Sequence, residues 1–296
     1  MSTETTPSSL HGADVIASLA QRFPQLYLTP SEDALEAYRA AAGRGIAPEH
    51  ATLDHFVGNP ADELRSVDTP SGPVEVVFLA ERSDFETFLQ LIGHKAQPVP
   101  IARTVGAITY RGLPDWGKVA AARERYLAQG GDDWGSEFAR LAHEPGAFRS
   151  ELVVISEGPY SNVPAERTPF GADEWARVSR EIRLHHECAH VVCRRVMPDV
   201  ITPVWDEVTA DVAGLLAATG SYDPARAALF LGVGEGGFGE GRLAEYLDEE
   251  QATRIDAIAA DVHASIVRIA EACGAAEAAD PFGFVLRLKR EPDLRY

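Results

Sequence analysis

The sequence is poor in cysteine and in long apolar runs, and each shortage excludes a class of protein. Its 296 residues include three cysteines, Cys188, Cys193 and Cys273. So few, and an odd number, do not make a disulfide framework and fit a reducing compartment. Apolar runs such as residues 74–80 are too short to span a bilayer, and the polar N-terminus is unlike a signal peptide. These features predict a cytoplasmic protein.

Basic residues are also scarce. The chain has 27 lysines and arginines against 45 aspartates and glutamates, a formal net charge of −18. A field of this sign repels phosphate backbones and anionic lipid surfaces, so the composition predicts neither a nucleic-acid partner nor a membrane partner. Hydrophobic residues make up 45% of the chain, an ordinary globular value. The length suffices for one large domain or two smaller ones.

The first half of the chain mixes strand and helix patterns. Residues 1–11 are polar and predict a disordered tail. Segments rich in β-branched and aromatic residues predict strands at residues 74–81, 102–112 and 150–158. Residues 58–73 are rich in turn formers and predict a loop. Helical patterns separate the strands, so residues 12–170 are predicted to form a mixed α/β region.

From residue 171 onward the pattern is helical. A long amphipathic helix begins near Asp173 and ends before Pro198. Thr202 and Pro203 then resemble an N-cap followed by proline at the first helical position. Residues 171–296 are therefore predicted to form a helical region, and the histidines at residues 185, 186 and 190 predict that it binds a metal ion. The expected fold class is α+β, with a small mixed β-sheet in the N-terminal half and a mainly helical C-terminal half.

The long helix carries an H-E-x-x-H motif at residues 186–190. Residues four apart project from one face of a helix, so His186 and His190 are able to offer ring nitrogens to one ion. Zinc suits such ligands. Glu187, next to the first ligand, can reach a water molecule and act as a general base. His185 points about 100° away from His186 and is expected to pack rather than to bind the ion.

A catalytic zinc needs a third protein ligand and a position open to water. Glu207 lies in the second turn of the following helix, and an antiparallel return would bring it beside the two histidines. Asp211, four residues later, is expected on the same side, where its carboxylate can accept the N–H of a ligand imidazole. Two histidines and one carboxylate also describe non-haem iron(II) sites. The donor set alone therefore leaves Zn²⁺ and Fe²⁺ open.

The combined motif, H-E-x-x-H followed by E-x-x-x-D at residues 207–211, resembles the gluzincin metallopeptidases over residues 173–214. The resemblance implies a zincin-like fold, zinc as the cofactor, and the ligand and base roles given above. Asp206 stands where gluzincins usually carry asparagine. A wider likeness over residues 151–270, in HHECAH, DEVTAD and GRLAEY, is to a family of uncharacterised bacterial zincin-like proteins. That likeness implies the fold and the site but no substrate.

The expected activity is metal-dependent hydrolysis of an amide or peptide bond, with a peptide or a small molecule as substrate. Two alternatives stay open: a non-peptidase metalloenzyme, with zinc or non-haem iron, acting on a small metabolite, and a non-catalytic metal-binding protein. Arg242 and Tyr246, four residues apart, are expected to face the site and bind substrate. Residues 232–237 read G-x-G-x-x-G but follow no βαβ strand, so they predict a flexible loop over the site rather than a dinucleotide site.

Overall fold

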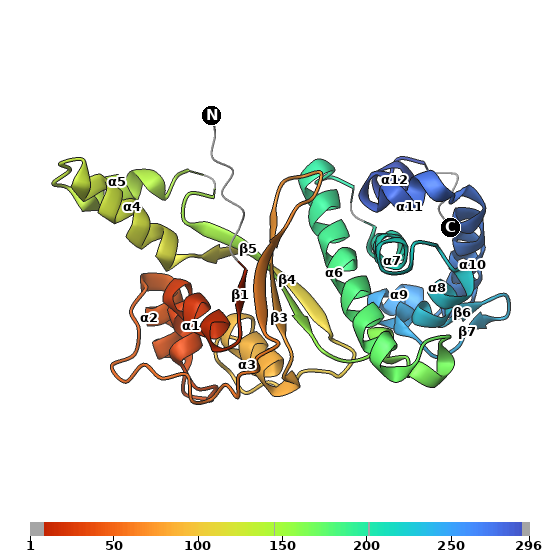
Figure 1. Ribbon diagram of the computed structural model, residues 1–296, viewed down its shortest axis with the longest axis horizontal. Coiled ribbons are helices and arrows are strands. Elements are labelled where there is room, and N and C mark those ends of the chain that lie inside the picture. The colour runs from red at the N-terminus through yellow and green to blue at the C-terminus, as the bar shows by residue number, and fades with distance from the viewer. Residues whose placement is uncertain (1–8, 145, 201, 292–296) are drawn as a thin grey trace. The chain divides into compact units, whose positions relative to one another are not determined.

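The computed structural model describes residues 9–144, 146–200 and 202–291, and these divide into two compact units (Figure 1). Among the described residues, the first unit comprises 9–66, 75–102 and 108–156, and the second comprises 67–74, 103–107 and 157–291. The chain is α+β, as the sequence predicts, with a small mixed sheet in the N-terminal half and helices in the C-terminal half. The expected boundary at residue 170/171 lies inside the second unit, which also takes two short segments from the N-terminal half.

The first unit is built around a five-stranded sheet with the strand order β1-β2-β3-β5-β4. The strands are β1 (Leu10–His11), β2 (Glu63–Val67), β3 (Val74–Leu79), β4 (Ala107–Pro114) and β5 (Arg149–Ser156). β1 pairs with β2 antiparallel, whereas β3 pairs with β5 in parallel. Nearly every side chain of β3 and β5 is buried, as expected of strands covered on both faces.

Two expectations from the sequence need correction here. Leu10 and His11, assigned to a disordered tail, pair with Leu64 and Glu63; residues 1–8 of that tail lie outside the described residues. β2 itself falls within residues 58–73, which were predicted to be a loop. Turn formers surround this five-residue strand and favoured a loop, although β2 lies in the sheet between β3, which follows after residues 68–73, and the distant β1.

Helices accompany the sheet in the first unit. They are α1 (Ala13–Arg22), η1 (Pro24–Tyr27), α2 (Leu35–Arg44), α3 (Arg82–Ile92), α4 (Trp116–Ala128) and α5 (Trp134–Leu141). Arg22, at the end of α1, pairs with Glu75 of β3 at 2.6 Å and with Asp115 at 2.8 Å. Asp115 also caps α4, because its carboxylate accepts the backbone N–H of Lys118. One guanidinium therefore ties two helices to the sheet.

The second unit is mainly helical. Its elements are η2 (Tyr160–Asn162), η3 (Ala165–Arg167), α6 (Ala172–Val196), α7 (Pro203–Thr219), α8 (Pro224–Leu231), β6 (Val233–Gly234), β7 (Gly237–Phe238), η4 (Arg242–Tyr246), α9 (Glu249–Ala252), α10 (Ile255–Ala272), α11 (Ala275–Ala279) and α12 (Pro281–Leu288). Its core contains Ile182 of α6, the fully buried Trp205 of α7 and Phe230 of α8. Among the helices described, none is long and apolar enough to cross a bilayer.

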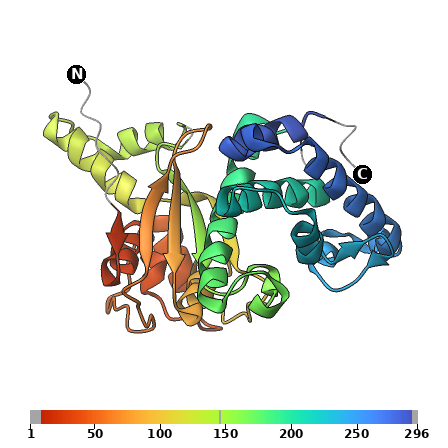
Figure 2. The ribbon, with the colours of Figure 1, turned by 45° about the vertical axis from the view of Figure 1, so that its right-hand side comes forward.

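Helices α6 and α7 lie side by side, as Figures 1 and 2 both show. α7 begins with Pro203 at its first position and ends at Gly220 in the left-handed region, the usual signals at the two ends of a helix. Gly214 allows the two helices to approach closely, because a Cβ there would lie 2.8 Å from the carbonyl oxygen of Ile182. This contact brings the first turns of α7 against the H-E-x-x-H segment of α6.

Candidate metal centre

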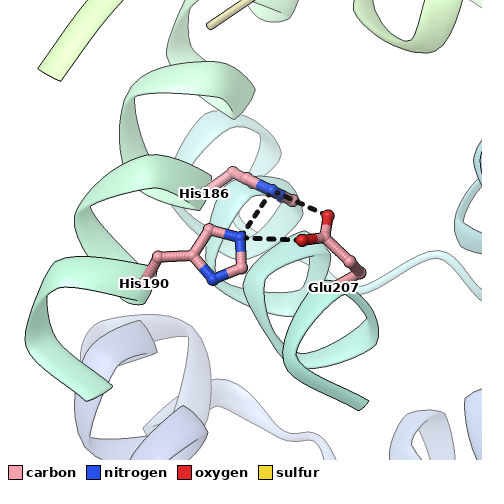
Figure 3. Close-up of side chains that lie close together, drawn as sticks. All are labelled: His186, His190 and Glu207. Carbon is pink, nitrogen blue, oxygen red and sulfur yellow. Dashed lines mark hydrogen bonds and ion pairs between the residues drawn. The ribbon is translucent and has the colours of Figure 1, made fainter. Parts of the chain in front are cut away.

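Three side chains from α6 and α7 converge on one point (Figure 3). His186 and His190 lie one turn apart on α6, and their Nε2 atoms are 3.1 Å apart. Glu207, in the second turn of α7, places one carboxylate oxygen 3.3 Å from Nε2 of His186 and the other 3.2 Å from Nε2 of His190. The structure therefore brings together the three residues that the sequence proposes as ligands.

The spacing of these donor atoms fits a small metal ion. Two atoms that each lie 2.0–2.1 Å from a tetrahedral zinc stand roughly 3.3 Å apart, close to the 3.1 Å between the two histidine nitrogens. Each of these nitrogens has a different oxygen of Glu207 at a similar distance. Two imidazoles and a carboxylate are ligands that zinc accepts, and iron(II) accepts the same set. Within the described residues, this is the one group of three or more His, Cys, Asp or Glu donors arranged to hold an ion.

Hydrogen bonds within the cluster shift its protonation. Burial alone would lower the pKa of His186, but hydrogen bonds with Asp211 and Glu207 raise it to about 9. Burial would raise the pKa of Glu207, but the charges and hydrogen bonds of His190 and His186 hold it well below the ordinary value. In the metal-free protein, these partners favour the protonated imidazole of His186. A metal ion has to displace that proton, so its binding weakens as the pH falls.

Asp211 lies behind His186, where the sequence predicts it. Its Oδ1 is 2.9 Å from Nδ1 of His186, and its side chain is 1% exposed. Nη2 of Arg242 donates to both of its oxygens, at 2.8 and 2.7 Å. Since Arg242 is itself buried, the two opposite charges offset each other inside the protein, which a buried carboxylate requires.

Arg242 and Tyr246 both belong to η4, and both line the pocket around the cluster. Nη1 of Arg242 donates to the Tyr246 hydroxyl at 3.2 Å and lies 3.8 Å from Glu207. The guanidinium of Arg242 is therefore committed mainly to Asp211, whereas the Tyr246 side chain is less buried. The expected role of these two residues in binding substrate stays a prediction.

The pocket has a volume of about 220 Å³, and all of its walls come from the second unit. Its lining comprises residues 104–107, Tyr160, Ser161, Arg183, His186, Glu187, His190, Glu207, Arg242, Glu245 and Tyr246. Glu187 thus lines the same pocket as the three donor residues but does not belong to their cluster. The glycine-rich run does not line this pocket; it forms the β6–β7 hairpin, where Asp256 of α10 accepts the N–H of Phe238 at 3.0 Å.

Other notable side chains near the motif have packing partners instead. The ring of His185 stacks on Phe282, and its Nδ1 lies 3.0 Å from the carbonyl oxygen of Glu181, so it faces away from the cluster, as predicted. Cys193 is a free thiol whose pKa is raised by burial to about 11. Asp206 pairs with Lys289 and accepts from Thr202. The aspartate at this position, where gluzincins usually carry asparagine, thus contacts α12 and the start of α7.

Sequence reasoning singled out neither Tyr160 and Arg183 nor residues 104–107, which all line the pocket. Tyr160 contacts both His186 and Asp211 through its hydroxyl. Gly106 packs against Arg183, because a Cβ there would lie 2.5 Å from the guanidinium Nε. Residues 156–163, which contain Tyr160, form a turn-rich run that follows a predicted strand. From the sequence they were open to two interpretations, an edge that positions substrate or a link into the long helix. Residues 104–107 gave no signal, because they reach the pocket only through contacts with residues distant in the sequence.

A family model described as a family of unknown function (DUF7005) matches residues 8–276. The chain therefore belongs to that family. Neither the curated proteins nor the solved structures include a match to this chain. Family membership names no activity, so the function has to be argued from the residues of the site.

Proposed function

We propose that this member of a family of unknown function is a zinc-dependent hydrolase that cleaves an amide or peptide bond. The convergence of His186, His190 and Glu207 supports this proposal: the two Nε2 atoms are 3.1 Å apart, and each has one oxygen of Glu207 within 3.3 Å. Such spacing suits a small tetrahedral ion. His186, His190 and Glu207 would hold the ion. Zinc in such a site supplies Lewis acidity toward water and toward a carbonyl oxygen. The cluster contains three protein donors, the number found in catalytic rather than structural zinc sites.

Glu187 is the general base in this proposal. It follows His186 directly on α6 and lines the same pocket without joining the donor cluster. Its carboxylate would take a proton from the attacking water as the carbon–oxygen bond forms. The same proton would pass to the leaving nitrogen as the carbon–nitrogen bond breaks, which leaves an acid and an amine as products. Such proton transfer typically contributes about 10²–10⁴-fold to the rate.

Tyr246 is the side chain that we assign to the substrate carbonyl. Tyr246 lines the pocket, and its hydroxyl accepts from Arg242 at 3.2 Å and also contacts Glu207. A hydroxyl at this place would donate to the negative charge that develops on the attacked oxygen. Arg242 would then act by holding Tyr246 and by balancing Asp211, and only indirectly on the substrate.

The size of the pocket favours a second candidate, a metalloenzyme acting on a small metabolite. Its volume of about 220 Å³ lies below the roughly 300–1,000 Å³ of most ligand sites. Two histidines and one carboxylate also form the facial site of non-haem iron enzymes. Metal analysis separates the iron form of this candidate from the hydrolase, because iron in preference to zinc contradicts the hydrolase; the substrate screen separates the zinc form.

The test combines a substrate screen with a matched pair of variants. Zinc-loaded protein is incubated with a library of peptides and N-acyl amino acids, and released amines are detected by mass spectrometry. Glu187→Gln is expected to keep about one zinc per chain and to lose at least about 100-fold in turnover. Glu181→Gln, on the same helix but outside the pocket lining, serves as the control and is expected to retain activity. Full activity in Glu187→Gln would exclude the general-base role.

A further inference from the structure

We infer that Tyr160, a buried tyrosine outside both sequence motifs, positions the imidazole of His186 for the metal by sharing its outer nitrogen with Asp211. This role presupposes the proposed metal site and adds to it a residue on a different element, η2. Tyr160 precedes His186 by 26 residues and is 3% exposed. At this burial, the polar hydroxyl needs hydrogen-bond partners among the side chains around it.

Three polar atoms form a closed triangle behind the metal cluster. The Tyr160 hydroxyl oxygen is 2.8 Å from Nδ1 of His186 and 2.5 Å from Oδ1 of Asp211. Nδ1 of His186 and Oδ1 of Asp211 are 2.9 Å apart. Each atom is therefore within hydrogen-bond distance of the other two.

The chemistry of the three groups fixes the direction of these hydrogen bonds. Nε2 of His186 faces His190 and Glu207, so a metal-binding His186 has to carry its hydrogen on Nδ1. Both oxygens of Asp211 accept from Nη2 of Arg242, so Asp211 is an ionised carboxylate that only accepts. We therefore assign the Tyr160 hydrogen to Asp211. The Tyr160 oxygen is then left to accept from Nδ1, and this excludes the tautomer with hydrogen on Nε2.

Asp211 alone would hold the His186 imidazole less firmly than Asp211 and Tyr160 together, because Oδ1 of Asp211 has other donors. The same oxygen accepts from Nη2 of Arg242 at 2.8 Å and from Tyr160. The Nδ1 hydrogen of His186 thus has two partial acceptors in place of one full acceptor. Partners of this kind orient a ligand ring and set its donor strength.

The neighbours of the Tyr160 ring fix its position. Cζ of Arg242 lies 4.8 Å from the ring centroid, and the ring of Phe230 meets it edge-on at 4.9 Å. The backbone N–H of Tyr160 donates to the hydroxyl of Ser179 on α6 at 2.9 Å. These contacts therefore fix the Tyr160 ring, and with it the hydroxyl that contacts His186.

The loop before Tyr160 is clamped to the same helix. Arg183 of α6 donates to the carbonyl oxygens of Gly158 and Pro159, both at 2.7 Å. The two residues after Tyr160, Ser161 and Asn162, have φ values of 53° and 56°. Residues other than glycine seldom adopt this left-handed conformation. Such strain persists where the surroundings over-determine the backbone, which is common at functional sites.

Tyr160→Phe tests this role, with Tyr222→Phe as the matched control. Tyr222 is buried in the same unit, and within the described residues its hydroxyl has no hydrogen-bond partner. The dissociation constant for Zn²⁺ is measured by competition with a chromogenic chelator. Tyr160→Phe is expected to weaken zinc binding about 10- to 100-fold, whereas Tyr222→Phe keeps the wild-type constant.

Two further measurements separate positioning from a general loss of structure. In the zinc-loaded wild type, long-range ¹H–¹⁵N spectra are expected to show hydrogen on Nδ1 of His186. A nuclear Overhauser effect is expected between this hydrogen and the ring protons of Tyr160. Tyr160→Phe shifts this resonance, and Tyr222→Phe does not. In a double-mutant cycle, Tyr160→Phe is expected to cost less zinc affinity in an Asp211→Asn background than in the wild type, because both residues act through the same imidazole.

The outcomes distinguish this role from the proposed function. A wild type that binds no divalent metal contradicts the metal site, and with it the positioning role. A wild type that binds one zinc, with equal affinity in Tyr160→Phe and an unchanged Nδ1 resonance, overturns the role of Tyr160 alone. Hydrogen on Nε2 of His186 in the zinc-loaded wild type overturns it as well, even if Tyr160→Phe does not fold.

Discussion

Replacing Gly214 with alanine tests how closely α6 and α7 have to approach for the site to form. A Gly→Ala change within a helix ordinarily stabilises by about 1 kcal/mol. At Gly214 the new Cβ would lie 2.8 Å from the carbonyl oxygen of Ile182 and 2.9 Å from its Cγ2. Ordinary carbon contacts are about 3.5–4.0 Å, and the carbonyl belongs to the backbone of α6, so the helices themselves have to separate.

Two opposing terms set the expected size of the effect. Overpacking of this kind costs typically about 1–3 kcal/mol, which exceeds the propensity gain. We expect Gly214→Ala to lower the free energy of unfolding by about 1 kcal/mol. Ile182 lies one turn before His186, and Gly214 lies one turn after Asp211. A separation at this contact therefore also moves the donors apart and weakens zinc binding.

Gly43→Ala provides the matched control. Gly43 lies in α2, and a Cβ there would meet nothing within 4 Å. This variant is expected to gain stability, by up to about 1 kcal/mol. Urea unfolding followed by circular dichroism gives the free energies, and chelator competition gives the zinc affinities. If Gly214→Ala gained as much stability as Gly43→Ala and bound zinc like the wild type, the close-contact reasoning would be refuted.

Two further predictions concern buried charges. Burial would raise the pKa of Asp115, but Arg22 and Ser150 hold it below its ordinary value. The folded pKa thus lies below the unfolded pKa, which is near 3.9. This carboxylate therefore stabilises the fold above that pH, and the stabilisation is lost as the pH falls through the folded pKa. Asp115→Asn is therefore expected to cost about 2 kcal/mol near neutral pH and little in acid; a loss in urea unfolding that did not change with pH would contradict this. Asp206→Asn removes a carboxylate charge from the buried ammonium of Lys289. This variant is expected to lower the free energy of unfolding by about 3–5 kcal/mol, more than Lys289→Met, which removes the buried charge itself. A larger loss in Lys289→Met than in Asp206→Asn, measured by thermal denaturation, would contradict this order.

The helices of the site could be predicted because their signals are local. Pro198 and Pro203 mark the end of α6 and the beginning of α7, and helix geometry alone puts His186 and His190 on one face. Glu207 follows within 21 residues of His186 across one short turn, so few arrangements were open to it. The convergence of these residues could therefore be predicted from their spacing along the chain.

Contacts between distant segments could not be predicted in this way. β2 lies in the sheet between β3, which follows after residues 68–73, and β1, whose residues are more than fifty positions earlier. No local pattern carries the pairing with β1. Tyr160 reaches His186 because Arg183 and Ser179 clamp its loop to α6. The sequence shows a turn-rich run there, but not which helix it meets. The pairing of Arg242 with Asp211 likewise depends on the fold of the whole second unit.

Metal content tests the central claim most directly. Wild-type protein purified without added metal, together with Glu187→Gln and Glu207→Gln, is examined by inductively coupled plasma mass spectrometry. We expect about one zinc per chain in the wild type and in Glu187→Gln, and far less in Glu207→Gln, which loses a charged donor. No bound metal in the wild type, iron in place of zinc, or an undiminished zinc content in Glu207→Gln would contradict a zinc hydrolase built on His186, His190 and Glu207.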